Sequence, residues 1–61
     1  MSEENVRDHL SNQGYSVQRI ALRDIASELV YQVYVRDNTA KNLKLYVDPS
    51  SGSILKTEVL Q

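Results

Sequence analysis

The chain has 61 residues with no cysteine, 41% of them hydrophobic, and a formal net charge of −1 from seven basic and eight acidic side chains. Its length allows one domain whose core is too small for a deep catalytic pocket, and the lack of cysteine excludes disulfides and thiol-bound zinc. The balanced, scattered charges argue against nucleic acid as a partner, and no run approaches the roughly 20 apolar residues of a membrane span.

Residues 2–13 are predicted to form a short helix. Ser2 is suited to the N-cap, and the acidic residues that follow it are favoured by the helix dipole. Val6 and Leu10 are four residues apart and therefore share one face, while Gly14 is a helix stop signal. Because so short a helix is not stable alone in water, we expect its apolar face to pack on another element.

The segment 15–23 is predicted to be a strand with an irregularity. Its apolar residues alternate with a period of two, but the phase of the alternation changes near Gln18 and Arg19. A bulge at that point would bring four apolar side chains to one face of the sheet: Tyr15, Val17, Ile20 and Leu22.

The segments 29–36 and 43–48 alternate cleanly, as strands with one buried face do. The side chains expected to point inward are Tyr31, Val33, Val35, Leu43, Leu45 and Val47. Those expected to point outward are Gln32, Tyr34, Arg36, Lys44 and Tyr46. A polar connection over 37–42 has the length of a hairpin loop, and 53–60 is the last predicted strand.

Asp48, Pro49 and Gly52 are predicted to form a structural turn between the last two strands. Proline fixes its own φ, glycine accepts a positive φ, and the aspartate side chain can accept hydrogen bonds from turn N–H groups. A calcium loop is the alternative, but such loops supply several oxygen ligands, and Asp48 is the only acidic residue in this one.

These elements predict an α+β fold in one domain, residues 1–61. An N-terminal helix packs on one face of a three- or four-stranded antiparallel sheet, in the order α-β-β-β-β. The other face of the sheet is then open to water or to a partner.

Two sets of polar residues are considered as catalytic or metal-binding groups. His9 is the only histidine, and the neighbouring Asp8 does not share its helix face, so a metal site is not expected. The serines of the predicted turn have no base or oxyanion donors beside them, and turn chemistry explains them better: Ser50, Ser51 and Ser53.

Asp24 and Glu28 are expected to flank a loop over 24–27 between the first two strands. Paired carboxylates perform acid–base chemistry when a pocket separates their pKa values, but a loop tip on so small a domain offers no pocket. We therefore predict solvated charges here, and no catalytic residue, metal or cofactor in the chain.

The outward tyrosines are the strongest candidates for a binding surface. Tyr34 and Tyr46 are expected on neighbouring strands, with Arg36 and Lys44 near them, and interfaces favour tyrosine for its large area and polar tip. The alternative is ordinary cross-strand pairing on a solvated face. Stacking on single-stranded nucleic acid is a further alternative, against which the overall acidity argues.

The second half of the chain carries a family resemblance. It contains a Tyr-x-Val-x-Val strand, a Tyr-Val-Asp strand end, an Asp-x-x-Ser-Gly turn and an Ile-Leu closing strand, and residues 14–22 fit the first strand of the same family. The chain thereby resembles the PepSY family along nearly its whole length, through Tyr31, Val33, Val35, Tyr46, Val47, Asp48, Gly52, Ile54 and Leu55.

The resemblance implies a binding role. PepSY modules occur in propeptides of thermolysin-like metallopeptidases and as domains outside the bacterial cytoplasm, with proposed control of local protease activity. It therefore implies a non-enzymatic regulator of a protein or peptide partner, such as a metallopeptidase, in an extracytoplasmic setting. The polar start over 1–5 is not expected to act as a signal peptide. The alternative is a structural or ligand-sensing accessory domain of a larger envelope protein.

Overall fold

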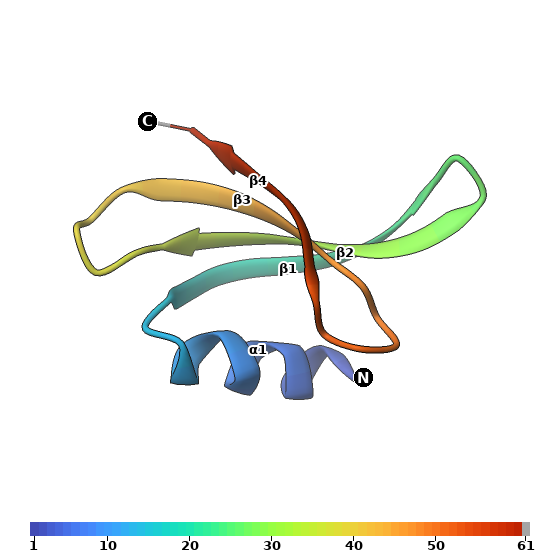
Figure 1. Ribbon diagram of the computed structural model, residues 1–61, viewed down its shortest axis with the longest axis horizontal. Helices are drawn as coiled ribbons and strands as arrows, with labels where there is room; N and C mark the ends of the chain where they lie inside the picture. The colour runs from blue at the N-terminus through green and yellow to red at the C-terminus, as the bar shows by residue number, and fades with distance from the viewer. Residues whose placement is uncertain (61) are drawn as a thin grey trace.

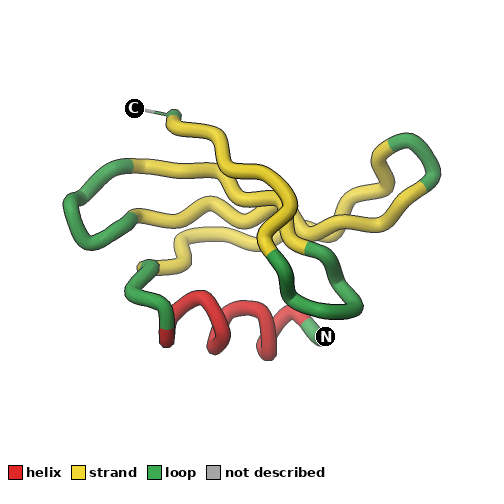
Figure 2. The backbone as a smooth tube through the Cα atoms, in the orientation of Figure 1, coloured by secondary structure: helices red, strands yellow, loops and turns green. Residues whose placement is uncertain are grey.

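The computed structural model describes residues 1–60. The elements are α1 (Glu3–Asn12), β1 (Ser16–Ile25), β2 (Glu28–Arg36), β3 (Asn42–Val47) and β4 (Ile54–Val59). The strands form one antiparallel sheet in the order β1-β2-β3-β4, and the helix lies against one face of it (Figures 1 and 2). The predicted fold class is confirmed, and the sheet has four strands.

Both ends of α1 are capped as the sequence suggests. At the start, the Ser2 Oγ accepts a hydrogen bond of 3.1 Å from the Asn5 N–H. At the end, Gly14 adopts a φ of 96°, and the N–H of Tyr15 donates to the carbonyl of Leu10 over 3.1 Å. Together with the bond from the Gly14 N–H to the Ser11 carbonyl, this is a Schellman motif. The cap ends the helix and turns the chain into β1.

The core lies between α1 and the two central strands. Val6 and Leu10 are fully buried, each stabilising the fold by roughly 2 kcal/mol, and they meet the inward side chains of β2 and β3. The predicted inward residues of these strands are all buried: Tyr31, Val33, Val35, Leu43, Leu45 and Val47. Helix and sheet thus bury each other's apolar surface.

The bulge predicted in the first strand is confirmed. Val17 pairs with Val35 and Arg19 with Tyr34, so Gln18 is an extra residue on β1. The bulge restores the phase of the strand, and Tyr15, Val17 and Ile20 pack against the core.

Leu22 lies on the predicted face of the sheet but is not buried. Leu22 pairs with Tyr31, as an inward residue would, but its side chain is 51% exposed. Figure 1 shows the reason: the β1–β2 hairpin extends past the N-terminal end of α1, so no helix covers its end.

The loop predicted over 24–27 was wrong, because the two strands continue to a two-residue turn. Ile25 pairs with Glu28, and Ala26 and Ser27 between them have φ values of 52° and 68°. Two left-handed residues in succession form a type I′ turn, whose twist matches that of the strands. Ala26 and Ser27 occupy the two positions where type I′ turns favour Asn and Gly, so the sequence does not indicate this turn.

The β3–β4 turn is held by its own side chains. The Asp48 carboxylate accepts hydrogen bonds from the Ser50 N–H (2.9 Å) and hydroxyl (2.8 Å), and these contacts lower the pKa of Asp48. The Gly52 N–H donates to the Asp48 carbonyl over 2.8 Å. Pro49 lies within the turn, and Gly52 has a φ of 78°.

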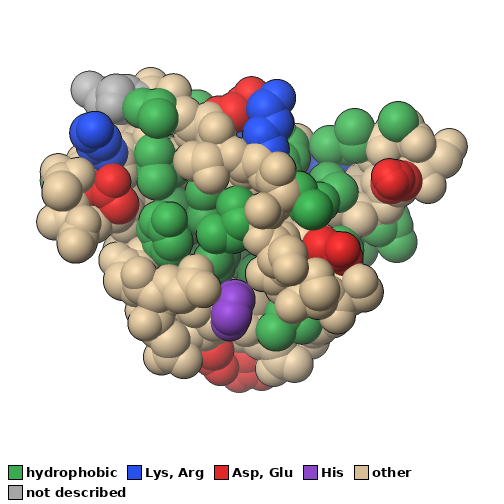
Figure 3. Space-filling view, viewed as in Figure 1, with side chains coloured by type: hydrophobic (Ala, Val, Ile, Leu, Met, Phe, Trp, Pro, Cys, Tyr) green, Lys and Arg blue, Asp and Glu red, His purple; other side chains and the backbone are tan. Residues whose placement is uncertain are grey.

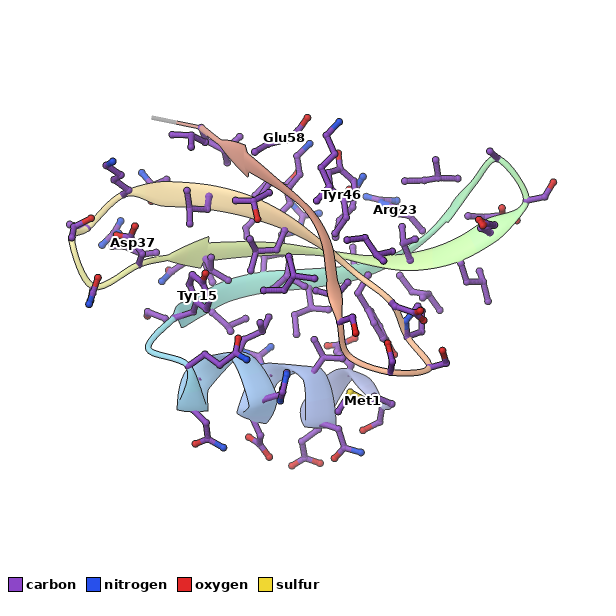
Figure 4. The ribbon with its side chains drawn as sticks, in the orientation of Figure 1. Met1, Tyr15, Arg23, Asp37, Tyr46 and Glu58 are labelled. Atoms are coloured by element: carbon purple, nitrogen blue, oxygen red, sulfur yellow. The ribbon has the colours of Figure 1, made fainter. Side chains whose placement is uncertain are left out.

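Met1 packs against this turn. Its backbone nitrogen donates to the Pro49 carbonyl, and its carbonyl accepts a hydrogen bond of 3.2 Å from the Tyr31 hydroxyl. Its Sδ lies where a Cβ on Gly52 would stand. The turn, the segment before α1 and β2 therefore meet at one end of the domain (Figure 4).

β4 forms an edge of the sheet that the helix leaves uncovered. Its register shifts where Tyr46 pairs with Lys56 and Val47 with Ile54, which makes Leu55 an extra residue. Four apolar residues at this edge are exposed, namely Ile54, Leu55, Val59 and Leu60. A band of hydrophobic side chains is visible between α1 and β4 (Figure 3).

The close approach at Gly52 predicts a difference between two glycine variants. In Gly14→Ala the only source of strain is the positive φ, because no atom lies within 4 Å of the added Cβ. This variant should lower the free energy of unfolding by about 1 kcal/mol. Gly52→Ala must also displace Met1 and should cost about 2 kcal/mol. Urea denaturation measures both values, and equal costs would show that the Met1 contact contributes nothing.

The type I′ turn predicts a stabilised variant. Replacing Ala26 by Asn and Ser27 by Gly puts favoured residues at both left-handed positions and should raise the free energy of unfolding by about 1 kcal/mol. Ser53→Gly is the control, because Ser53 is not left-handed and glycine there should not stabilise. An Asn-Gly variant no more stable than the parent would contradict the turn geometry.

Candidate functional site

The outer face, which is the sheet face opposite α1, collects side chains from all four strands. Directly paired residues of antiparallel strands point to the same side, so the register defines rows across this face. The first row is Arg19, Tyr34, Lys44 and Glu58, and the second is Ala21, Gln32, Tyr46 and Lys56. Figure 4 shows Arg23, Tyr46 and Glu58 on the side of the sheet away from the helix.

Two tyrosines and two lysines form the centre of this face. The Lys44 Nζ lies 5.7 Å from the ring centroids of both Tyr34 and Tyr46. The Lys56 Nζ lies 5.7 Å from the Tyr46 ring. These distances are within reach of cation–π attraction. Each ring is half-buried by its neighbours, and we call these four residues with Glu58 the Tyr–Lys cluster.

Glu58 ties the cluster together. One carboxylate oxygen lies 3.5 Å from the Lys44 Nζ and accepts a hydrogen bond of 3.2 Å from the Tyr46 hydroxyl. The other oxygen lies 3.6 Å from the Lys56 Nζ. The carboxylate thus fixes the positions of two cations and one ring without leaving a free negative charge at the centre.

The electrostatics of the cluster keep both kinds of group charged. Interaction with the Tyr46 hydroxyl raises the pKa of Lys44, opposed by desolvation and reinforced by Glu58. Desolvation acts to raise the pKa of Glu58, but the Tyr46 hydrogen bond and the two lysines together lower it. The stabilisation from Glu58 is therefore present above its ordinary pKa and is lost as pH falls through the lowered value. The stabilisation from Lys44 is lost only as pH rises through the raised pKa of Lys44.

The structure brings together three of the four residues predicted to bind a partner. Tyr34, Lys44 and Tyr46 belong to the cluster, whereas Arg36 lies further along the same face. The Arg36 Nε donates to the Asn42 Oδ1 over 3.4 Å, and its side chain is exposed. Arg36 therefore lies at the margin of the surface.

Sequence reasoning missed the contribution of β4. Lys56 and Glu58 complete the cluster, but 53–60 shows no clean alternation because Leu55 is bulged out of register. A regular register continued from the β3–β4 turn does not pair Lys56 with Tyr46. That pairing requires the bulge at Leu55. The available sequence signal was the spacing of Lys56 and Glu58, since two charged residues two positions apart share one face of a strand.

An open cavity of about 420 Å³ adjoins the cluster. It lies between the end of the β1–β2 hairpin and the centre of the outer face, with Ile25 and Val30 on one side and Tyr46 and Lys56 on the other. Arg23 pairs with Val30, one of the residues that line the cavity. The cavity thus combines apolar walls with one cation, Lys56, and one carboxylate, Glu28.

The remaining polar candidates do not converge. The Nε2 atoms of His9 and Gln13 lie 3.4 Å apart, and within residues 1–60 no group of His, Asp and Glu could hold a metal ion. Asp24 pairs with Leu29 on the helix side, whereas Glu28 points to the outer face.

The serines of the β3–β4 turn bond within that turn. Besides the Ser50 contacts with Asp48, the Ser51 hydroxyl donates to the Ser53 hydroxyl over 3.0 Å. In the part of the chain that the structure describes, no helix has the length and apolar character needed to cross a membrane.

Comparison with known proteins places the chain in a family. Searches of curated proteins and of solved structures gave no significant match. The profile of PepSY_2, described as "Peptidase propeptide and YPEB domain", matches residues 1–58. Domains of this family are propeptide-like or inhibitor-like modules and are generally non-catalytic. With this match over nearly its full length, the chain belongs to the PepSY family of peptidase propeptide and YPEB domains.

Proposed function

We propose that this domain is a protein-binding regulator of a peptidase and that the outer face of its sheet is the contact surface. The observation that carries the proposal is the Tyr–Lys cluster, which stands on an uncovered sheet face in a family of peptidase propeptide domains. Membership of that family also supports an extracytoplasmic location, in the periplasm, secreted or at the envelope.

The cluster has the properties of a prepared interface. Tyr34 and Tyr46 present ring area with a polar tip, and their lysine and glutamate neighbours restrain them before binding. Side chains that are already ordered lose less entropy when a partner docks. Aromatic residues at the centre of a contact commonly carry most of its binding free energy.

The β4 edge offers a second contact. In the part of the chain that the structure describes, no strand lies beyond β4, so an extended segment of a partner can add to the sheet there. The bulge at Leu55 and the charge of Lys56 limit unspecific pairing at this edge.

A structural or ligand-sensing accessory role in a larger envelope protein is the second candidate. The exposed apolar residues of β4 favour it, because the uncovered band between α1 and β4 is suited to packing against a neighbouring domain.

An inhibition assay tests the regulatory role. Titrating the domain into a thermolysin-like metallopeptidase should give saturable inhibition, and mass spectrometry should find the domain intact at the end. A regulator that occupies the enzyme resists cleavage because its sheet backbone is already paired. No inhibition, or digestion of the domain, would contradict peptidase control and favour the accessory role.

A double variant tests the surface. Tyr34→Ala with Tyr46→Ala should retain the circular dichroism spectrum, because both rings lie outside the core, and weaken inhibition of the same peptidase about tenfold or more. Leu29→Ala is the control, since Leu29 is 58% exposed and points to the helix side. Equal inhibition by a folded double variant and the parent would exclude the outer face as the contact.

A further inference from the structure

The fold separates charges that are mixed in the sequence. The chain has seven basic residues and a net charge of −1. Five of the seven occupy outward positions on the sheet, and they come from all four strands: Arg19, Arg23, Arg36, Lys44 and Lys56. A surface with this excess of cations attracts anionic partners and speeds their association.

The acidic residues are mostly placed elsewhere. Only Glu28 and Glu58 point to the outer face, and Glu58 is held between two lysines. Asp37 and Asp48 use their carboxylates to hold turns, accepting backbone N–H bonds of 2.8 to 2.9 Å. Four others lie on α1 or on the helix side of β1: Glu3, Glu4, Asp8 and Asp24. The outer face therefore carries five cations against two carboxylates.

Two of the cations are free to bind. Within residues 1–60, Arg19 and Arg23 form no ion pair, in contrast to Lys44 and Lys56, while Arg36, also outside any ion pair, donates a hydrogen bond to Asn42. They stand on β1 at positions separated by Ala21, whose small side chain leaves space between them. Guanidinium groups bind carboxylates through paired N–H donors.

Apolar surface lies beside one of these cations, Arg23. Val30, the partner of Arg23, lines the cavity together with Ile25 and the Tyr46 ring. A segment that follows the face can therefore place a carboxylate on β1 and an apolar side chain in the cavity. Figure 4 shows Tyr46 and Arg23 on this same side of the sheet.

We propose that the outer face binds an acidic peptide segment of the protein partner, with carboxylates paired to Arg19 and Arg23 and one apolar side chain seated against Ile25, Val30 and Tyr46. This inference rests on the proposed function, because it specifies the chemistry of the partner that the same surface recognises.

The binding test uses a fluorescein-labelled, glutamate-rich peptide that carries one leucine, measured by fluorescence anisotropy. The parent domain should bind it with an affinity that falls as salt rises, and a lysine-rich peptide with the same leucine should not bind. Replacing the leucine by alanine should weaken binding severalfold, since the cavity then loses its occupant.

Two charge-reversed variants locate the site. Arg19→Glu with Arg23→Glu should weaken binding of the glutamate-rich peptide more than about tenfold. Arg7→Glu with Lys41→Glu changes the net charge equally, but these residues lie on α1 and in the β2–β3 loop, so binding should change less than about twofold. Circular dichroism confirms that both variants fold.

Several outcomes would overturn the inference. Equal losses in the two charge-reversed variants would mean that only net charge matters. Tighter binding to phosphatidylglycerol vesicles or to oligothymidine than to the peptide would assign the face to other polyanions. An unchanged affinity for the alanine peptide would remove the cavity from the site. If the domain inhibits the peptidase but does not bind the peptide, this inference fails while the regulatory function stands.

Discussion

The packing of one short helix on one face of the sheet determines the other features of this domain. Val6 and Leu10 are fully buried against the inward side chains of β2 and β3, including Val33 and Leu45. Within residues 1–60, α1 is the only helix, and it leaves the opposite face uncovered. Polar and aromatic side chains must therefore occupy that face, and the strict alternation of the central strands places them there.

The antiparallel register turns this constraint into a surface built from all four strands. Each row across the outer face takes one residue from each strand, so residues far apart in the chain become neighbours. Tyr46 and Glu58 meet through a hydrogen bond although twelve positions separate them. The same geometry brings together on one face basic residues that are scattered along the sequence. The family match is to a peptidase propeptide and YPEB domain, and the proposed role of this surface in peptidase control rests on it.

Local signals predicted the fold well, and long-range placement was harder. The Schellman cap at Gly14 and the bulge at Gln18 follow from residue type and a phase change. The turn at Ala26 and Ser27 did not, because neither residue favours a positive φ and only strand pairing imposes it. Leu22 lies on the predicted face yet is exposed, because alternation reveals the face of a residue but not whether a helix reaches it. The role of β4 was hidden by a bulge, so the Tyr–Lys cluster was predicted only in part.

The most direct test of this account is an amide chemical-shift map of the isotope-labelled domain with a thermolysin-like metallopeptidase. If the partner binds the outer face, shifts and line broadening concentrate on the outward residues of neighbouring strands, chiefly Tyr34, Lys44, Tyr46 and Lys56, while α1 is unaffected. Perturbation concentrated on α1 and on the apolar residues Val59 and Leu60 would contradict it, because the partner would then occupy the band between the helix and β4.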